Sequence, residues 1–328
     1  MRIGVLCSGG DSPGMNACLR AITRSAISQG VEVVGFLNGY EGLLNGELYQ
    51  TKNGLNRFLM QTVSGISKRG GTFLYSSRSE EFATEYGMRK AAGVLKRLEI
   101  DALIPIGGNG TLTGAHQLGK YWDGQIVGCP GTIDNDVCGT DYTIGFCTAV
   151  QTAVEAVDKL RDTATSHKRM FLVELMGRHC GYITLYTALA SGCELAFIPE
   201  RPLEIHEMIV KLAILKEVGK KSVMAVVAEG YHDGVVALKE KLKAAGCPFP
   251  IREVILGHLL RGGDPCPEDR ILATVIGDLA VSAILKGETD KMAGMRNHLP
   301  TLVSLEEATS GHQVIPSNLI DLLERVSK

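Results

Sequence analysis

Short hydrophobic runs alternate along the chain with longer stretches in which apolar residues recur at helical spacing. The short runs predict strands at residues 3–7, 31–36, 102–106, 125–129, 170–175, 195–199, 222–228 and 254–256. The longer stretches predict helices, most clearly at residues 15–29, 84–98 and 143–163. Strands that alternate with helices form parallel sheets with helices on both faces, so we expect an α/β protein.

The number of strands indicates two doubly wound, mainly parallel sheets rather than one. In such folds ligands bind at the carboxyl ends of strands, where loops meet the starts of helices. Pairs of consecutive glycines lie at such places, at residues 9–10, 70–71, 107–108 and 262–263. The segment from about residue 286 onward is more polar, and its pattern predicts no clear element.

The composition narrows the class of protein. Of the 328 residues, 45% are hydrophobic and 21% are charged, which is the balance of an ordinary globular protein. The formal net charge is −2, so the chain has no overall basic field to attract nucleic acid or an anionic membrane, and we expect neither partner. No stretch approaches the length of a membrane span. The nine cysteines include no C-x-x-C pair, which favours a reduced, cytoplasmic protein.

Two glycine-rich loops each follow a predicted strand and precede a helical stretch. The first is SGGDSPGMN at residues 8–16, and the second is IGGNGTLTG at residues 106–114. Glycines let a backbone approach a phosphate closely, and the N–H groups at a helix start favour anions. Neither loop has the lysine of a P-loop, and each loop alone is also compatible with a tight turn that binds nothing.

A third loop, PGTIDND at residues 130–136, places two carboxylates directly after a strand. Asp134 and Asp136 lie two positions apart, so in extended backbone their side chains point the same way. Like charges so placed are relieved by a cation, and one carboxylate can act as a base while the other faces hydrated Mg²⁺. A solvated turn is the alternative for this sequence taken alone.

Basic side chains gather near other predicted strand ends. They are Arg161, His167, Lys168, Arg169, Arg178, Arg252, His258 and Arg261. A single arginine is more often part of a surface ion pair. Several at the strand ends of an α/β protein better fit a phosphorylated substrate, because the guanidinium binds phosphate in a fixed fork.

Taken together, these loops resemble those of the ATP-dependent phosphofructokinase family of bacterial type. The resemblance follows the chain in order over about residues 1–285, and it rests on SGGDSPGMN, GGT followed by SSR, GGNGT, PGTIDND, GTDYTIGF, LRDTATSHKR, MGRHCG and LGHLLRGG. It implies two lobes with the active site between them. Residues 1–140 with about 259–310 would form the nucleotide-binding lobe, and residues 141–258 with the C-terminal tail the lobe for fructose 6-phosphate.

For the nucleotide, the resemblance implies ATP with Mg²⁺. Gly10 would place its N–H against the transferred phosphoryl group, and Tyr40 and Arg78 would border the nucleotide. Asn109 and Asp136 would lie on the side of the metal. The rest of the nucleotide cradle would be Gly108, Gly110, Thr111 and Gly114.

For the transfer, the resemblance implies that Asp134 takes the proton from the sugar 1-hydroxyl, with Thr132 beside it, and that Arg178 steadies the moving phosphoryl group. The residues that would bind fructose 6-phosphate are Thr132, Asp134, Asp136, Arg169, Met176, Gly177, Arg178, Glu229, Arg252, His258 and Arg261. Of these, Arg169 and Arg252 would reach over from a neighbouring subunit. The resemblance therefore implies a homo-oligomer, by family habit a tetramer, with shared active sites.

The residues that differ between relatives favour ATP as the donor. Relatives that use pyrophosphate have Asp where this chain has Gly110 and Lys where it has Gly131. The chain departs from the family at Asn109, where Asp is usual, and at Tyr75, where Gly is usual and a bulky ring would approach the nucleotide side. Two alternatives stay open: a relative that uses pyrophosphate or another sugar phosphate, and a weakly active regulatory paralogue.

Overall fold

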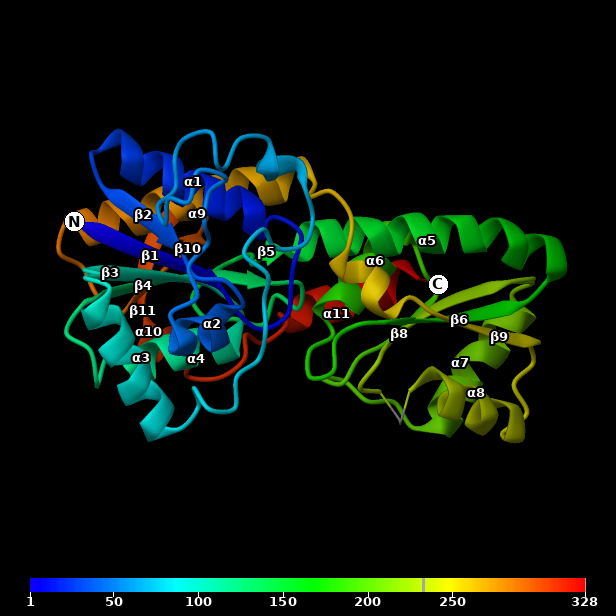
Figure 1. The fold of residues 1–328 in the computed structure, drawn as a ribbon. Helices are drawn as coiled ribbons and strands as arrows, with labels where there is room; N and C mark the ends of the chain where they lie inside the picture. Colours follow the sequence, from blue (N-terminus) through cyan, green and yellow to red (C-terminus); the bar gives the residue numbers. More distant parts are fainter. Residues whose placement is uncertain (232–233, 328) are drawn as a thin grey trace. The chain divides into compact units, whose positions relative to one another are not determined.

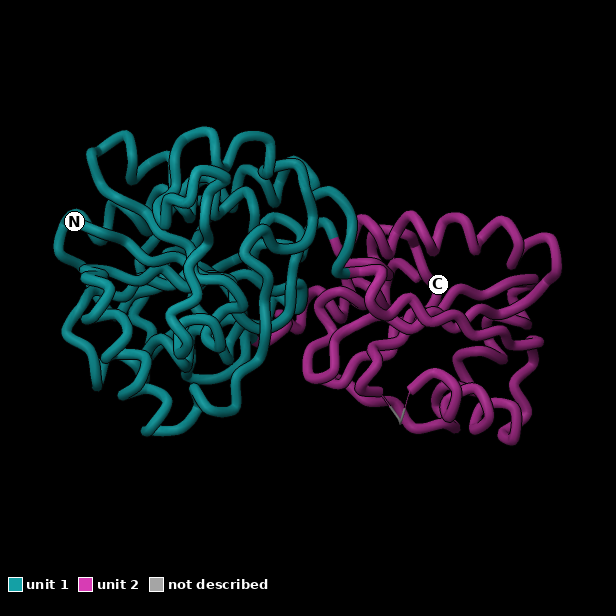
Figure 2. Tube along the Cα trace, in the orientation of Figure 1, with its two compact units in different colours: residues 1–148, 261–313 teal, residues 149–260, 314–328 magenta. Residues whose placement is uncertain are grey.

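The computed structural model describes residues 1–231 and 234–327. The chain forms two compact units, which are distinguished by colour in Figure 2. Unit 1 consists of Met1–Thr148 and Arg261–Gln313, and unit 2 of Ala149–Leu260 and Val314–Lys328. Each unit has its own β-sheet with helices packed against it (Figure 1).

Unit 1 contains a seven-stranded sheet in the order β11-β10-β4-β3-β1-β2, with β5 paired to β4. The strands are β1 (Arg2–Cys7), β2 (Glu32–Gly35), β3 (Ala102–Gly107), β4 (Gln125–Thr132), β5 (Ile144–Gly145), β10 (Lys291–Arg296) and β11 (Leu299–Ser304). The pair β10–β11 is antiparallel, and the other pairs among these strands are parallel. The carboxyl ends of β1, β3 and β4 therefore lie at the same edge of the sheet.

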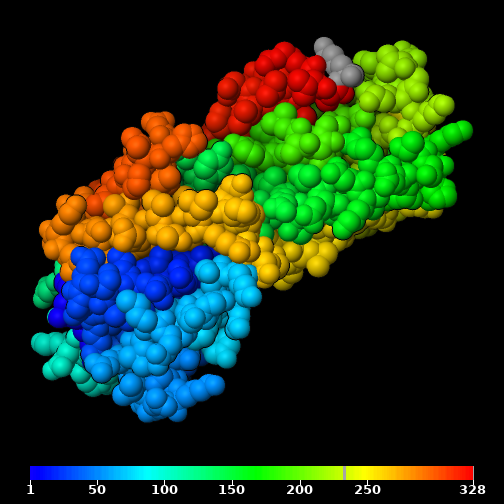
Figure 3. All heavy atoms as spheres, turned by 90° about the horizontal axis from the view of Figure 1, so that it is seen from above, coloured from blue at the N-terminus to red at the C-terminus, as the bar shows by residue number. Residues whose placement is uncertain are grey.

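Side chains alternate between two cores across this sheet. Val5 and Ile104 belong to one core, whereas Leu6 and Leu103 belong to the other. The first core is covered by α1 (Met15–Ser28) and α9 (Pro267–Leu285), which lie side by side (Figure 3), together with the short η1 (Ile66–Lys68). The second is covered by α2 (Gly39–Asn45), α3 (Glu85–Arg97), α4 (Asn109–Leu118) and α10 (Leu305–Ala308).

Unit 2 contains a four-stranded sheet in the order β7-β8-β6-β9, with parallel pairs throughout its described strands. The strands are β6 (Met170–Leu175), β7 (Leu195–Phe197), β8 (Val223–Ala228) and β9 (Ile251–Ile255). The helices are α5 (Phe146–His167), which begins in unit 1, and α6 (Tyr182–Ser191), α7 (Ile205–Glu217), α8 (Val235–Ala244) and α11 (Ser317–Val326). The prediction of two doubly wound, mainly parallel sheets is confirmed.

The C-terminal segment contributes elements that the sequence did not predict. β10 and β11 extend the sheet of unit 1, and α11 packs on α6 in unit 2, where it is the red segment against green residues in Figure 3. β9 is also longer than the predicted strand at 254–256, because its polar residues Arg252 and Glu253 pair with β6. None of the described helices combines the length and the apolar composition needed to cross a bilayer.

Candidate active site

The loops after β1, β3 and β4 surround a cavity of about 630 Å³ in unit 1. This volume is typical of a site for a small molecule. The residues singled out in the sequence that line the cavity are Gly10, Tyr40, Arg78, Gly108, Asn109, Gly110, Thr111, Gly114, Gly131, Thr132, Asp134, Asp136 and Arg261. The three loops expected to carry chemistry therefore meet in one place.

The loop after β1 is tied to the segment that carries Arg78. The Gly9 N–H donates to the Ser77 carbonyl at 3.1 Å, and the Ser76 hydroxyl donates to the Gly9 carbonyl at 2.6 Å. Gly9 has a φ of +83°, a conformation that glycine adopts without strain. These bonds fix the guanidinium-bearing segment against the first glycine loop.

Arg261 crosses the same glycine loop. Its Nη1 donates to the Asp11 carbonyl at 3.0 Å, and its guanidinium lies so close to Gly10 that a side chain at Gly10 would collide with it. A positive charge is thus fixed beside the amide that was predicted to face a phosphoryl group. A cation and a glycine N–H at one point suit an anionic ligand.

The second glycine loop leads directly from β3 into α4. The helix begins at Asn109. Its Thr111 N–H donates to the Gly108 carbonyl at 3.0 Å, and the N–H groups before Thr111 have no partner within the helix. The Thr111 hydroxyl donates to the Ser8 carbonyl at 2.9 Å, which holds the first two loops together. A Cβ at Gly107 would overlap both Thr111 and Ser8. Only glycine at 107 lets the loops approach so closely, and the free amides of α4 favour a phosphate.

Tyr40 and Phe82 form an aromatic wall of the cavity. Their rings are stacked, with centroids 3.8 Å apart and planes 5° from parallel. The Tyr40 hydroxyl donates to the Thr111 carbonyl at 2.7 Å, and burial raises the pKa of Tyr40, so the phenol stays protonated. A Cβ at Gly114 would lie 2.9 Å from the Phe82 ring and 3.2 Å from Tyr40, so glycine leaves room for this wall.

Two further glycines differ in the space around them. A Cβ at Gly110 would have no neighbouring heavy atom within 4 Å among the described residues, so a side chain there would project into open space. A Cβ at Gly131 would lie 2.9 Å from the Met15 side chain and 3.3 Å from that of Ile106. Both positions line the cavity, but a side chain at 110 would enter open space, whereas one at 131 would meet side chains of the core.

Asn135 shapes the third loop. It is buried with a φ of +54°, its Oδ1 accepts from the Thr143 N–H at 2.8 Å, and its Nδ2 donates to the Asp141 carbonyl at 3.2 Å. The expected extended backbone is therefore wrong at this residue. Asp134 and Asp136 nevertheless both line the cavity, as their spacing suggested.

Asn109, Asp136 and His312 form a polar cluster in the cavity. Asn109 Nδ2 donates to the Asp136 carbonyl at 3.5 Å and lies 3.4 Å from His312 Nδ1, which is 2.9 Å from Asp136 Oδ2. Asn109 Oδ1 is buried and has no hydrogen-bond partner in the part of the chain that the structure describes. An orphaned amide oxygen beside a carboxylate supplies the oxygen ligands that Mg²⁺ prefers, so these residues fit that ion.

Sequence reasoning missed several cavity residues, among them Phe82 and His312, and misplaced Tyr75. Phe82 and His312 lie in polar stretches with no motif, so nothing local pointed to them. Tyr75 was expected to bring its ring to the nucleotide side, but it is 63% exposed and is not among the described residues that line the cavity. Its φ of +60° accounts for the glycine that is usual there.

The remaining predicted site residues belong to unit 2 and lie at opposite ends of its sheet. The group at the carboxyl ends of the strands comprises Met176, Gly177, Arg178 and Glu229, with His258 in η2 (Gly257–Arg261) after β9. The group at the amino ends comprises Arg169, which precedes β6, and Arg252, which pairs with Phe171. A six-residue strand separates the two groups by ~20 Å, so one phosphate cannot contact both groups of the same chain.

The sequence of this chain is similar to those of known proteins over nearly its whole length. The family model described as Phosphofructokinase matches residues 2–284. A Thermus thermophilus protein named ATP-dependent 6-phosphofructokinase 1 is 44% identical over 326 residues, which are 98% of this chain and 98% of that protein. A Bacillus subtilis protein named ATP-dependent 6-phosphofructokinase is 43% identical over 326 residues, 99% of each chain.

Solved structures with the same fold carry related names. The structure of phosphofructokinase from Saccharomyces cerevisiae matches with a TM-score of 0.84 and 36% identity, over 94% of this chain and 45% of that chain. A pyrophosphate-dependent phosphofructokinase from Marinobacter aquaeolei matches with a TM-score of 0.83 over 97% of this chain and 86% of that one. At 20% identity, this second similarity concerns the fold alone.

Proposed function

This chain belongs to the phosphofructokinase family, and we propose that it transfers the terminal phosphoryl group of ATP to the 1-hydroxyl of fructose 6-phosphate. The products are ADP and fructose 1,6-bisphosphate, which makes the reaction a step of glycolysis in the cytoplasm. The observation that carries the proposal is the cavity of unit 1, where glycine amides, Arg78 and Asp134 meet. These are the groups that phosphoryl transfer to an alcohol requires: charge stabilisation, positioning and a base.

ATP would occupy this cavity with its phosphates toward the glycine loops. The amides at Gly10 and at the start of α4, from Gly108 to Gly110, would bind the phosphate oxygens, and Arg78 would add a positive charge. The wall formed by the stacked rings of Tyr40 and Phe82 suits the flat adenine base of the nucleotide. Asn109 and Asp136 would hold Mg²⁺, which when bound neutralises charge on the phosphates.

Asp134 would act as the general base. Its backbone N–H donates to the Thr132 hydroxyl oxygen at 3.3 Å, and both residues line the cavity near Gly10. An aspartate carboxyl is ordinarily ionised at neutral pH and can accept the proton of the sugar hydroxyl as that oxygen attacks. Positioning this carboxylate is the task we assign to Asn135, whose two side-chain hydrogen bonds fix the turn.

The sugar phosphate would be bound by the carboxyl-end group of unit 2. In this proposal Arg178 steadies the charge on the transferred phosphoryl group, and Met176, Gly177 and Glu229 hold the sugar. His258 and Arg261 would bind the 6-phosphate. All of these residues except Arg261 follow strands of one parallel sheet, where ligands of α/β proteins bind.

We also propose that the enzyme is a homo-oligomer, by family habit a tetramer. Arg169 and Arg252 lie at the amino ends of β6 and β9, ~20 Å from the carboxyl-end group. Arginines so far from their own chain's sugar site can contribute to the 6-phosphate site of a second subunit. Shared sites of this kind would make activity depend on assembly.

The alternative donor is pyrophosphate, and the alternative function is that of a regulatory paralogue. Open space at Gly110 leaves room for the α-phosphate of a nucleotide, which favours ATP. The presence of Asp134 and Arg178 argues against a pure binding protein, because a protein that only binds a sugar phosphate has no use for a base.

An assay of the purified protein with ATP or pyrophosphate, each offered with fructose 6-phosphate, separates these functions. We expect turnover with ATP and Mg²⁺ and at least tenfold less with pyrophosphate. Turnover with neither donor, together with measurable binding of fructose 6-phosphate, would instead identify a regulatory paralogue. Faster turnover with pyrophosphate would contradict the proposed donor.

A further inference from the structure

His312 stands in the cavity without a role in the reaction described above. Its Nδ1 lies 2.9 Å from Asp136 Oδ2 and 3.4 Å from Asn109 Nδ2. The His312 side chain is 55% exposed, whereas that of Asp136 is 14% exposed. The imidazole thus covers the outer side of a carboxylate that is otherwise mostly buried.

The backbone holds His312 in this place. Val137 and His312 form an antiparallel bridge, and the Gln313 N–H donates to the Asp136 carbonyl at 2.9 Å. The C-terminal segment is therefore paired with the loop that carries Asp136, at His312 and at the residue that follows it. An exposed histidine on a free loop would have no such fixed relation to one carboxylate.

The hydrogen bonds of the cluster assign a donor to each contact. A neutral imidazole nitrogen either donates or accepts, and an ionised carboxylate only accepts, so His312 Nδ1–H donates to Asp136 Oδ2. Asn109 Nδ2 is also a donor and therefore pairs with the Asp136 carbonyl. Asn109 Oδ1 takes no part in these contacts and is buried without a partner among the described residues.

We propose that His312 is a positioning residue for the divalent cation that accompanies the nucleotide. It fixes one oxygen of Asp136 and so orients the other oxygen, together with Asn109 Oδ1, as the two ligands from the protein. This inference rests on the proposed function, because the cation is the one that would arrive with ATP. It gives the Asn at position 109 a reason: a second carboxylate there would compete for the single Nδ1 proton.

Binding of Mn²⁺, measured by electron paramagnetic resonance in the presence of a non-hydrolysable ATP analogue, tests the proposal. Residues that orient metal ligands typically change metal affinity ~10–100-fold when removed. Because His312 is half exposed, we expect His312→Ala to weaken Mn²⁺ binding ~10-fold. His312→Asn should restore most of the affinity, because its amide nitrogen takes the place of Nδ1. The KM for ATP with Mg²⁺ should rise in His312→Ala, and the KM for fructose 6-phosphate should not.

His116 provides a matched control. Its Nδ1 is 2.7 Å from Asp290 Oδ1 in the same unit, but His116 is not among the described residues that line the cavity. We expect His116→Ala to bind Mn²⁺ as the unmodified protein does. Unchanged Mn²⁺ affinity in His312→Ala would overturn the proposal. So would an equal loss in His116→Ala, or a His312→Asn variant no better than His312→Ala.

The proposed function and this inference can fail separately. If the unmodified protein does not phosphorylate fructose 6-phosphate but its Mn²⁺ binding depends on His312 as described, only the proposed function is wrong. If the protein is active with ATP and His312→Ala binds Mn²⁺ normally, only the inference is wrong.

Discussion

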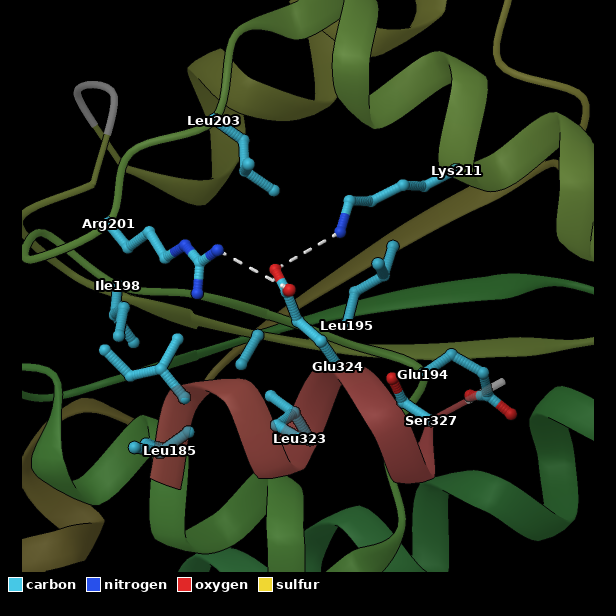
Figure 4. Close-up of a pocket in the computed structure, with 12 residues that line it drawn as sticks. Leu185, Glu194, Leu195, Ile198, Arg201, Leu203, Lys211, Leu323, Glu324 and Ser327 are labelled. Carbon is cyan, nitrogen blue, oxygen red and sulfur yellow. Dashed lines mark ion pairs between the residues drawn. The ribbon is translucent and has the colours of Figure 1, made fainter. Parts of the chain in front are cut away.

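The two units contain hollows of very different kinds. The cavity of unit 1 measures about 630 Å³, and the hollow under α11 in unit 2 measures about 40 Å³ (Figure 4). The first can hold a nucleotide, whereas the second has room for a few water molecules at most. Both are lined by charged as well as apolar residues, so charge alone does not distinguish a site from a gap in the packing.

What separates the two hollows is the kind of residue at their walls. Glycines and the start of α4 line the cavity of unit 1, so main-chain amides reach its interior. Leu185, Leu195 and Leu323 line the hollow of unit 2, as Figure 4 shows. Its charges are already paired, because Glu324 lies 3.5 Å from Arg201 and 3.6 Å from Lys211. Main-chain donors that face a cavity indicate a binding site. Charged side chains that already form ion pairs with one another do not.

The largest expected effect is that of removing the base from the large cavity. Asp134→Ser should lower kcat ~10²–10⁴-fold, the usual contribution of a general base, while ATP and fructose 6-phosphate still bind. This corresponds to about 3–5 kcal/mol of barrier. Steady-state kinetics together with calorimetric titration of both ligands measure it.

The matched control for this change is Asp123→Ser. Asp123 is an exposed carboxylate before β4 and is not among the described residues that line the cavity. It should leave kcat within twofold of the original, an estimate based on the small effects of surface substitutions. Near-normal turnover of Asp134→Ser would remove Asp134 from the mechanism.

The next largest effect concerns the small hollow. Leu323→Ala removes a side chain that is only 7% exposed, on the face of α11 that Figure 4 shows toward Leu185. Enlarging a gap of this kind costs about 2–3 kcal/mol of the free energy of unfolding. ATP affinity should not change, since the nucleotide residues all belong to unit 1. Denaturant unfolding and ATP titration check both parts, and a loss of ATP binding in the folded variant would contradict the comparison.

Substitutions at Gly110 and Gly131, the two glycines that favour ATP as the donor, should have smaller effects that differ from each other. Gly110→Asp should raise the KM for ATP about tenfold, because the new carboxylate projects into open space where phosphates are expected. Gly131→Lys should instead destabilise the fold by about 1–3 kcal/mol, since its Cβ already meets Met15 and Ile106. Kinetics and thermal unfolding of each variant measure these effects. A fully stable Gly131→Lys variant that used pyrophosphate would contradict this account.

Much of the fold was predictable, because burial and periodicity agree over long stretches. β6 has the predicted bounds of 170 and 175, since nearly every side chain in it is buried. The C-terminal strands were missed for a physical reason: β10 joins the sheet through pairs such as Met292 with Gly128, and such pairing at long range leaves no local pattern. The predicted strand at 254–256 missed the first residues of β9, because these polar residues adopt the strand conformation by pairing with β6.

The same distinction applies to the candidate site. Residues on loops directly after strands, such as Gly10 and Asp134, were found because strand, turn and helix are adjacent in the sequence. His312 lies 176 residues from its partner Asp136, and Phe82 enters the cavity by stacking on Tyr40. Contacts of this kind are decided by tertiary packing, so only the structure reveals them.

The smallest expected effect concerns the contribution of the paired charges around the small hollow to the free energy of unfolding. Arg201 lies 3.0 Å from Asp321 and 3.5 Å from Glu324, but all three side chains are more than 40% exposed. Exposed pairs contribute about 0–1 kcal/mol, so Arg201→Met, which keeps the apolar stem, should cost less than about 1 kcal/mol of unfolding free energy. The cost should shrink further in 1 M salt, where exposed charges are screened. Denaturant unfolding at low and high salt measures the difference. A cost above about 2 kcal/mol, or one that salt leaves unchanged, would mean that the ion pairs of Arg201 stabilise the packing of α11 more than the burial of Leu323 does.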